Sequence, residues 1–179
     1  MRKIAVMIGS PSDLKQCLAG LEALKEACQR GEIELLGNVI QASSIHRATD
    51  DTLRLIRSYH ESENPPDVLI AGAGWANHLT GICDSYLRHT LHNTKTVVVG
   101  VAFTDPRDPI HTMAAILSIT EVPGHQVVFS DESGKFIGAN GFLCACRFTI
   151  SGKLPTITLP KPRPLETFTL EAAIAEAIT

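Results

Sequence analysis

Short apolar runs alternate with amphipathic segments along most of the chain. The apolar runs are typical of buried strands and cover residues 4–8, 32–40, 68–71, 96–101 and 126–129. Segments with apolar residues at helical spacing separate them, at about residues 12–29, 49–60, 76–87, 111–120 and 136–148. Parallel neighbours in a sheet need crossover helices, so the pattern predicts a three-layer αβα sandwich around a flavodoxin-like, doubly wound parallel sheet.

The pattern changes after residue 152, and we expect a single α/β domain over residues 1–152. The rest of the chain, residues 153–179, begins with a proline-rich stretch containing Pro155, Pro160, Pro162 and Pro164. Prolines at this density exclude regular core structure. Residues 170–178 then have the spacing of a short helix. We expect this tail to pack on a neighbouring subunit.

Composition narrows the class of protein. Of 179 residues, 44% are hydrophobic and 20% charged, and the formal net charge is -3 with lysines and arginines scattered. These values favour a globular domain without a broad basic surface for nucleic acid. No apolar run is long enough for a membrane span or a signal peptide, so we expect no membrane partner. Five cysteines without CxxC spacing favour free thiols in the cytoplasm.

The loop Gly9-Ser10-Pro11-Ser12-Asp13 follows the first predicted strand. A glycine after a strand, followed by hydroxyls at a helix N-terminus, provides free N–H groups and a helix dipole that favour phosphate. The alternative is that Ser12 or Asp13 only caps the helix, as such residues often do. Phosphate binding and capping are therefore both open for this loop.

A second polar loop, at residues 41–48, contains His46 and Arg47 side by side. A histidine can move protons near neutral pH, and an arginine is a fixed cation for phosphate or carboxylate. The alternative is an ordinary polar surface loop.

The third loop has Gly72 and Gly74 at a strand end, where a ligand can lie close to the backbone, and His78 follows one turn later. Here the alternative is a tight turn with a surface histidine.

The remaining candidates for metal binding are weak. Cys144 and Cys146 would point about 200° apart on a helix, which argues against a shared metal and for buried thiols. His89 and His92 lie in a polar stretch without a carboxylate motif. We therefore predict no metal site.

Taken together, the three loops resemble the signatures of the PurE family, the N5-carboxyaminoimidazole ribonucleotide mutases. The matching patterns are Gly-Ser-x-Ser-Asp, Ser-x-His-Arg, and Ala-Gly-Ala-Gly followed by His-Leu-x-Gly, in this order on successive strand ends. The similarity covers roughly residues 3–150 and ends in residues 138–143, which resemble the last helix of the family.

The resemblance implies a role for each matching position. His46 and His78 become the catalytic candidates, with His46 as the general acid/base. The substrate would contact Ser10, Ser12, Asp13, Ser44, Arg47, Ala71 and Gly72. The first five would hold its phosphate and ribose, and the last two, with His78, would line the pocket for its base and carboxylate.

The implied activity belongs to de novo purine biosynthesis. A carboxylate moves from N5 to C4 of N5-carboxyaminoimidazole ribonucleotide through released CO2, so the substrate is an aminoimidazole ribonucleotide and no cofactor is needed. Members of the family are typically homo-octamers whose C-terminal helices reach a neighbouring subunit. Two alternatives stay open: direct carboxylation of aminoimidazole ribonucleotide (or a reaction of a related ribonucleotide), and a non-catalytic nucleotide-binding module.

Several positions depart from the family pattern. Trp75-Ala76-Asn77 stands where Gly-Ala-Ala is usual, and residues 103–113 are unusually charged and contain prolines. Arg47 and His78 favour the mutase, whereas Asn77 and the segment before Pro65 lean slightly toward the direct carboxylase. An indole beside the pocket would narrow it or change its substrate.

Overall fold

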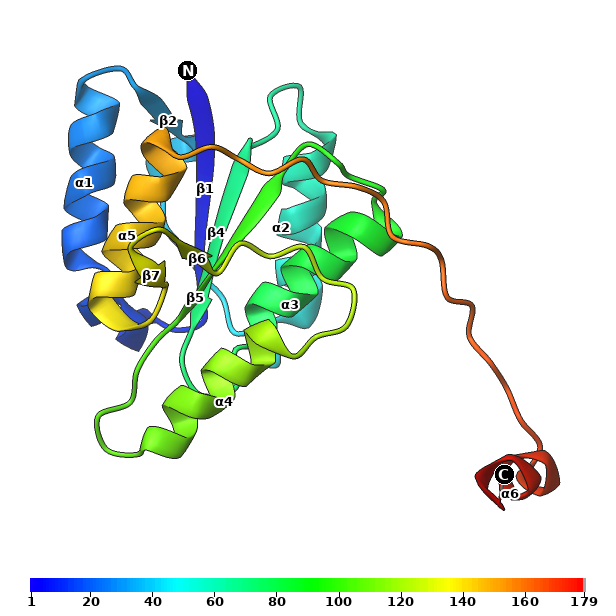
Figure 1. The fold of residues 1–179 in the computed structure, drawn as a ribbon. Helices are drawn as coiled ribbons and strands as arrows, with labels where there is room; N and C mark the ends of the chain where they lie inside the picture. The colour runs from blue at the N-terminus through cyan, green and yellow to red at the C-terminus, as the bar shows by residue number, and fades with distance from the viewer. Residues whose placement is uncertain (179) are drawn as a thin grey trace.

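A parallel β-sheet forms the middle layer of the protein (Figure 1). The computed structural model describes residues 1–178, and the strands of this sheet are β1 (Arg2–Ile8), β2 (Ile33–Leu35), β3 (Gln41–Ala42), β4 (Val68–Ala73) and β5 (Val97–Ala102). Their order is β2-β1-β4-β5, with β3 also paired to β1, and all pairs are parallel. The predicted three-layer, flavodoxin-like class is confirmed.

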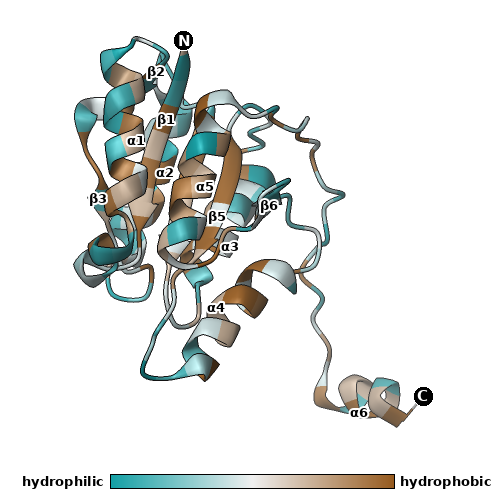
Figure 2. Cartoon of the chain, turned by 60° about the vertical axis from the view of Figure 1, so that its left-hand side comes forward, coloured by the Kyte–Doolittle hydropathy of each residue, from teal (hydrophilic) through white to brown (hydrophobic). Residues whose placement is uncertain are grey.

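Helices cover both faces of this sheet. On one face lie α1 (Leu18–Gln29) and α5 (Gly138–Ser151), and on the other lie α2 (Thr49–Glu61) and α3 (His78–Ser85) (Figure 1). Alternate residues of β1 enter the two cores: Ile4, Val6 and Ile8 on the first face, Ala5 and Met7 on the second. The helix α4 (Pro109–Thr120) packs beyond β5, which is apolar along its length (Figure 2).

The prediction of a single strand over residues 32–40 is wrong. The chain leaves β2 into a short 3₁₀ turn, η2 (Leu36–Asn38), in which Gly37 and Asn38 have φ values of 63° and 52°. These left-handed conformations interrupt the strand. The chain then returns to β1 as β3, at a position predicted to be loop, and this brings the second polar loop to the carboxyl end of β1.

The fifth predicted strand, residues 126–129, is also not a regular strand. Only Val128 pairs with β5, through an isolated parallel bridge to Val99. The N–H of Gln126 donates to the Asp84 carboxylate at 2.8 Å, and the carbonyl of Phe129 accepts from Phe136. The neighbouring backbone groups are thus used outside the sheet. A small antiparallel hairpin follows, made of β6 (Ser130–Asp131) and β7 (Gly134–Lys135).

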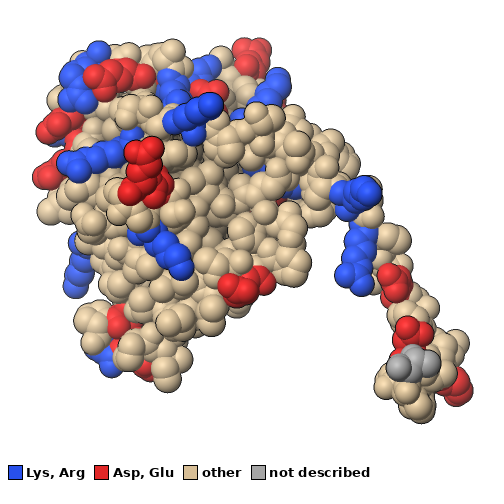
Figure 3. Space-filling view, viewed as in Figure 1, with Lys and Arg blue, Asp and Glu red and all other residues tan. Residues whose placement is uncertain are grey.

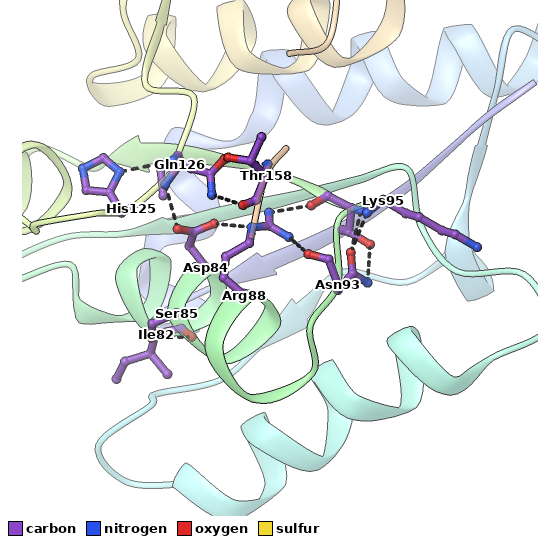
Figure 4. Close-up of polar contacts among 11 residues, drawn as sticks. Ile82, Asp84, Ser85, Arg88, Asn93, Lys95, His125, Gln126 and Thr158 are labelled. Atoms are coloured by element: carbon purple, nitrogen blue, oxygen red, sulfur yellow. Dashed lines mark hydrogen bonds and ion pairs between the residues drawn. The ribbon is translucent and has the colours of Figure 1, made fainter. Parts of the chain in front are cut away.

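Two predicted helices are divided. The first begins as a 3₁₀ helix, η1 (Pro11–Gln16), and continues as α1, while the predicted helix 76–87 is α3 followed by a π-helical turn, η3 (Tyr86–Thr90). A buried ion pair joins these last two segments, with Asp84 Oδ1 3.1 Å from Arg88 Nε (Figure 4). Arg88 also donates to the carbonyls of Asn93 and Thr96, which secures the turn leading to β5.

The tail begins on the surface of the domain. Ile157 is buried in the core beneath it, and the side chain of Gln126 both donates to the carbonyl and accepts from the N–H of Thr158 (Figure 4). From residue 161 to 178 every residue is exposed, and α6 (Leu170–Ile178) projects away from the domain (Figure 1). Among residues 1–178, no helix is both long and apolar enough to cross a membrane.

Charged side chains of both signs are interspersed on the face shown in Figure 3. On this face the distribution agrees with the scatter of lysines and arginines along the sequence.

Candidate active site

A pocket of about 510 Å³ opens at the carboxyl ends of β1, β3 and β4. Its walls come from the three loops singled out in the sequence, and one further residue, Arg107, lies on its rim. Parallel strands end at the same edge of a sheet, where doubly wound folds bind their ligands. Seven of the nine predicted site residues line it: Ser10, Ser12, Asp13, Ser44, His46, Arg47 and His78.

The first loop presents hydroxyl groups to this pocket. Ser10 caps η1, because its Oγ accepts from the N–H of Ser12 at 3.3 Å, so the cap is Ser10 rather than Ser12 or Asp13. The two serine hydroxyls also share a hydrogen bond of 2.8 Å. Gly9 allows close contact with the third loop, since a Cβ at Gly9 would lie 2.7 Å from that of Ala73.

Asp13 lies between the first and third loops. Burial raises the pKa of its carboxyl from 3.8 to about 6, and a hydrogen bond with the backbone of Ser10 opposes that rise. The carboxyl therefore changes its protonation state just below neutral pH. When it is ionised it can only accept hydrogen bonds, which suits hydroxyl groups better than phosphate oxygens.

The two candidate histidines meet across the pocket. His46 Nε2 lies 2.7 Å from His78 Nδ1, and the rings are nearly perpendicular at 79°, with centroids 4.9 Å apart. Both side chains are exposed on the pocket wall. The structure therefore brings together two proton-carrying groups from separate loops.

Neighbouring residues fix these histidines. Buried Ile45 anchors the second loop, and the N–H of Ser43 donates to the carbonyl of Ile8, the last residue of β1. Asn77 is fully buried and caps α3: its side chain accepts from the N–H of Thr80 and donates to the carbonyl of Val101 at 2.8 Å. Asn77 thus has a structural role directly before His78, at the start of α3.

Ala71 and Gly72 do not line the pocket, in contrast to the other predicted site residues. Both are buried within β4, where the carbonyl of Ala71 accepts from Thr80 and that of Gly72 accepts from Gly9. The pocket wall is formed two residues later, by Ala73 and Gly74. The position of this wall depends on how far β4 extends, which the apolar run at residues 68–71 underestimates by two residues.

On the far wall, sequence reasoning placed Trp75 beside the pocket but missed Arg107. Trp75 and Arg107 line the pocket, and each is held from behind. Trp75 stacks on His111 with ring centroids 4.2 Å apart, while Asp105 accepts hydrogen bonds from Arg107 and shares one with His111. These contacts hold the pKa of Asp105 well below its usual range, chiefly through Arg107. The signals in the sequence were the unusual Trp75 and the charge of residues 103–113.

Metal ligands are not gathered here: within residues 1–178, no group of three or more His, Cys, Asp or Glu side chains has an arrangement that could hold a metal ion. The five cysteines are free, with Cys17, Cys83 and Cys146 buried. Burial raises the pKa of the Cys83 thiol to about 12, so this group remains protonated and unreactive near neutral pH.

Comparison with models of protein families gives a match over most of the chain. The family model described as AIR carboxylase matches residues 3–147, which include every loop of the pocket. No curated protein sequence matches the chain.

Proposed function

The chain belongs to the AIR carboxylase family, and from this premise we propose that it transfers a carboxylate from N5 to C4 of N5-carboxyaminoimidazole ribonucleotide. Family membership implies an enzyme of purine biosynthesis that acts in the chemistry of aminoimidazole ribonucleotide and its carboxylated forms. The observation that carries the finer proposal is the contact between His46 and His78 in one pocket with Arg47.

The ribonucleotide is held at its phosphate and ribose in this proposal. Arg47 provides the cation, and hydroxyl groups from Ser10, Ser12 and Ser44 donate to phosphate oxygens. Asp13, once ionised, accepts from a ribose hydroxyl. This division of labour is supported by the shared pocket wall and by the chemistry of each group, since a carboxylate repels phosphate but accepts well from alcohols.

The first chemical step breaks the bond between N5 and its carboxylate. The bonding electrons stay on nitrogen, which takes a proton from the imidazolium of His46, and CO2 is released inside the pocket. C4 then attacks CO2 with the electrons of the ring enamine. The neutral imidazole of His46 removes the proton from C4, which restores the aromatic ring, so the histidine ends in its starting state.

His78 completes the proton path. A neutral imidazole carries one N–H, so the hydrogen bond between the two rings holds one shared proton, and its position sets the tautomer of His46. Through this contact a proton can pass between His78 and His46. The pair thereby supplies one proton and takes one back.

Direct carboxylation of aminoimidazole ribonucleotide by CO2 is the second candidate reaction. Asn77 was one of two features that favoured it, beside the segment before Pro65, but its side chain is used in capping α3 and in the bond to Val101. Its identity therefore says little about the substrate. A binding module without catalysis would need Arg47 and the serine hydroxyls but neither histidine, and the His46–His78 contact argues against that class.

The tail is proposed to pack on another copy of the chain, in a homo-oligomer that we take to be an octamer by family resemblance. Its support is an unpartnered apolar face: Leu170, Ile174 and Ile178 repeat every four residues along α6 and are all exposed. A helix with such a face is normally covered.

An ultraviolet assay for 4-carboxy-5-aminoimidazole ribonucleotide tests the proposal. Purified protein is given either the N5-carboxylated substrate or aminoimidazole ribonucleotide with bicarbonate. Rapid conversion of the first and little turnover of the second at low bicarbonate supports the mutase. Efficient use of the second mixture alone makes the protein a direct carboxylase, and the absence of turnover in both rejects the two reactions.

A further inference from the structure

The far wall of the pocket belongs to a connected group of four side chains from two segments of the chain. They are Trp75, Asp105, Arg107 and His111. Trp75 precedes α3, whereas the other three lie after β5 and in the first turns of α4. His111 joins the two segments, because its ring stacks on Trp75 at 19° while its Nδ1 lies 3.0 Å from Asp105 Oδ2. Only Trp75 and Arg107 face the pocket.

Asp105 holds the Arg107 side chain in place and leaves some of its N–H groups for other acceptors. Its Nε and Nη2 both donate to the Asp105 carboxylate, at 3.1 and 3.2 Å, and its backbone N–H donates to the same group at 3.0 Å. The guanidinium has five N–H bonds, so this fork leaves three for other acceptors. The side chain is 81% exposed, whereas that of Asp105 is 7% exposed, so the buried carboxylate fixes an accessible cation.

Trp75 is held in a conformation that bulky residues avoid. Its φ is 55°, and left-handed backbone is unfavourable for an L-residue with a bulky side chain. Its indole is 60% exposed yet rests on His111, where it contributes a flat surface to the pocket. Strain of this kind persists where the surroundings enforce it, and it is concentrated at ligand-binding positions.

We propose that Arg107 and Trp75 form a second subsite at the rim of the pocket, which binds the carboxylate carried by the base of the ribonucleotide and the flat face beside it. Arg107 donates to the carboxylate and Trp75 lies against the ring, while Asp105 and His111 are positioning residues. The assignment rests on the proposed function, in which Arg47 and the serines take the phosphate. It makes the pocket a receptor for a ligand with two separated anionic groups.

Charge explains why the subsite is selective. The pocket wall has two guanidinium groups, Arg47 and Arg107, and one carboxylate, Asp13. A ligand with phosphate alone satisfies one cation and leaves the other to water. A ligand with phosphate and carboxylate satisfies both, and a charge-assisted bond of this type improves affinity roughly tenfold or more.

Fluorescence titration measures the effect directly, because Trp75 is the single tryptophan of the chain. The full chain is titrated with ribose 5-phosphate, aminoimidazole ribonucleotide and its C4-carboxylated form, and calorimetry provides affinities independent of the probe. We expect the carboxylated ligand to bind roughly tenfold more tightly than the uncarboxylated one. In Arg107→Gln, aminoimidazole ribonucleotide and its C4-carboxylated form should bind equally tightly, and the affinity for ribose 5-phosphate should be unchanged.

Arg30→Gln is the matched control. Arg30 makes the same fork, with Nε and Nη2 on the carboxylate of Glu32 two residues away, but it does not line the pocket. This variant should keep the tenfold preference. Asp105→Asn tests positioning, since it should lose the preference while Arg107 is still present.

Outcomes for the subsite and for the reaction are separable. If Arg107→Gln retains the preference for the carboxylated ligand, or weakens all three ligands equally, the subsite is wrong even where the mutase assay succeeds. If the preference collapses in Arg107→Gln although the wild type shows no turnover, the subsite stands and the proposed reaction fails.

Discussion

His46 Nε2 and His78 Nδ1 lie 2.7 Å apart, although His46 lies in the loop after β3 and His78 is the first residue of α3, after β4. The contact exists because β3 and β4 both end beside β1, which places the second and third loops on either side of the first. Neither histidine would approach the other if the strand order were different. The histidine pair is therefore a product of the sheet topology.

Replacement of His46 by Asn should reduce the turnover number of the mutase reaction by at least about 100-fold, because a positioned general acid/base contributes roughly that much or more. Affinity for ribose 5-phosphate should be preserved, since Arg47 and the serines remain. Turnover is measured in the ultraviolet assay, and binding by calorimetry. His89→Asn, at an exposed position outside the pocket, should behave as the wild type. Full activity in His46→Asn would end the proposed mechanism.

Asp13 predicts a specific pH dependence of stability. The pKa of its carboxyl is about 6 in the folded protein and 3.8 in its ordinary state, so the folded protein binds this proton more tightly than the unfolded chain. The resulting stabilisation is complete below pH 3.8 and is lost as pH rises to about 6. Solvent around the half-buried carboxylate screens much of the penalty, which leaves about 1 kcal/mol.

Asp13→Asn lacks this titration. Urea unfolding is measured between about pH 3.5 and 8, a range that brackets both pKa values. The free energy of unfolding of the variant should rise relative to that of the wild type between about pH 4 and 6, with a constant difference above that range. Glu166→Gln, on the exposed tail, is the control and should parallel the wild type. A difference between Asp13→Asn and the wild type that is the same at every pH would contradict the assigned pKa.

The sequence was sufficient for those parts of the site that depend on local pattern. The first two loops were located because glycine, serine and histidine follow strands, and strand ends converge in a parallel fold. The wall at Ala73 and Gly74 was misplaced because β4 runs two residues beyond its β-branched core, into small residues with no strand signal. Arg107 was missed because its place on the rim depends on Asp105 and on the stack of Trp75 with His111, which are tertiary contacts.

Gly141 should be intolerant of a side chain. A Cβ at this position of α5 would lie 2.3 Å from the backbone carbonyl carbon of Phe136, which cannot move without shifting the loop after β7. We expect Gly141→Ala to lower the free energy of unfolding by about 2–3 kcal/mol, as overpacking typically does. Urea denaturation of the variant measures this change.

Gly81 provides the opposite case within another helix. A Cβ at Gly81 would meet its nearest neighbours at 3.8 Å, which is ordinary contact, so Gly81→Ala should stabilise α3 by about 0.5–1 kcal/mol. If both alanine variants were destabilised alike, the contact with Phe136 would not be the cause of the loss at Gly141.

The hydrogen bonds between Gln126 and Thr158 determine where the tail can be removed without damage to the domain. Ile157 is buried in the core and Thr158 is bound on both backbone groups, so truncation before Pro155 would damage the domain as well as remove the tail. Removal of residues 161–179 keeps both contacts and deletes only a segment whose described part is exposed throughout. The shortened chain should therefore retain the unfolding midpoint of its domain while its assembly changes.

If α6 packs on another copy, the chain lacking residues 161–179 should form a smaller oligomer than the full chain, as measured by light scattering on a sizing column. Leu170→Glu with Ile174→Glu in the full chain should have the same effect, because two charges on the apolar face of α6 oppose its burial. Glu171→Gln and Glu176→Gln change the same helix without charging that face and should leave the mass unchanged. An unaltered mass in both the truncated and the Leu170/Ile174 variants would show that assembly does not use the tail.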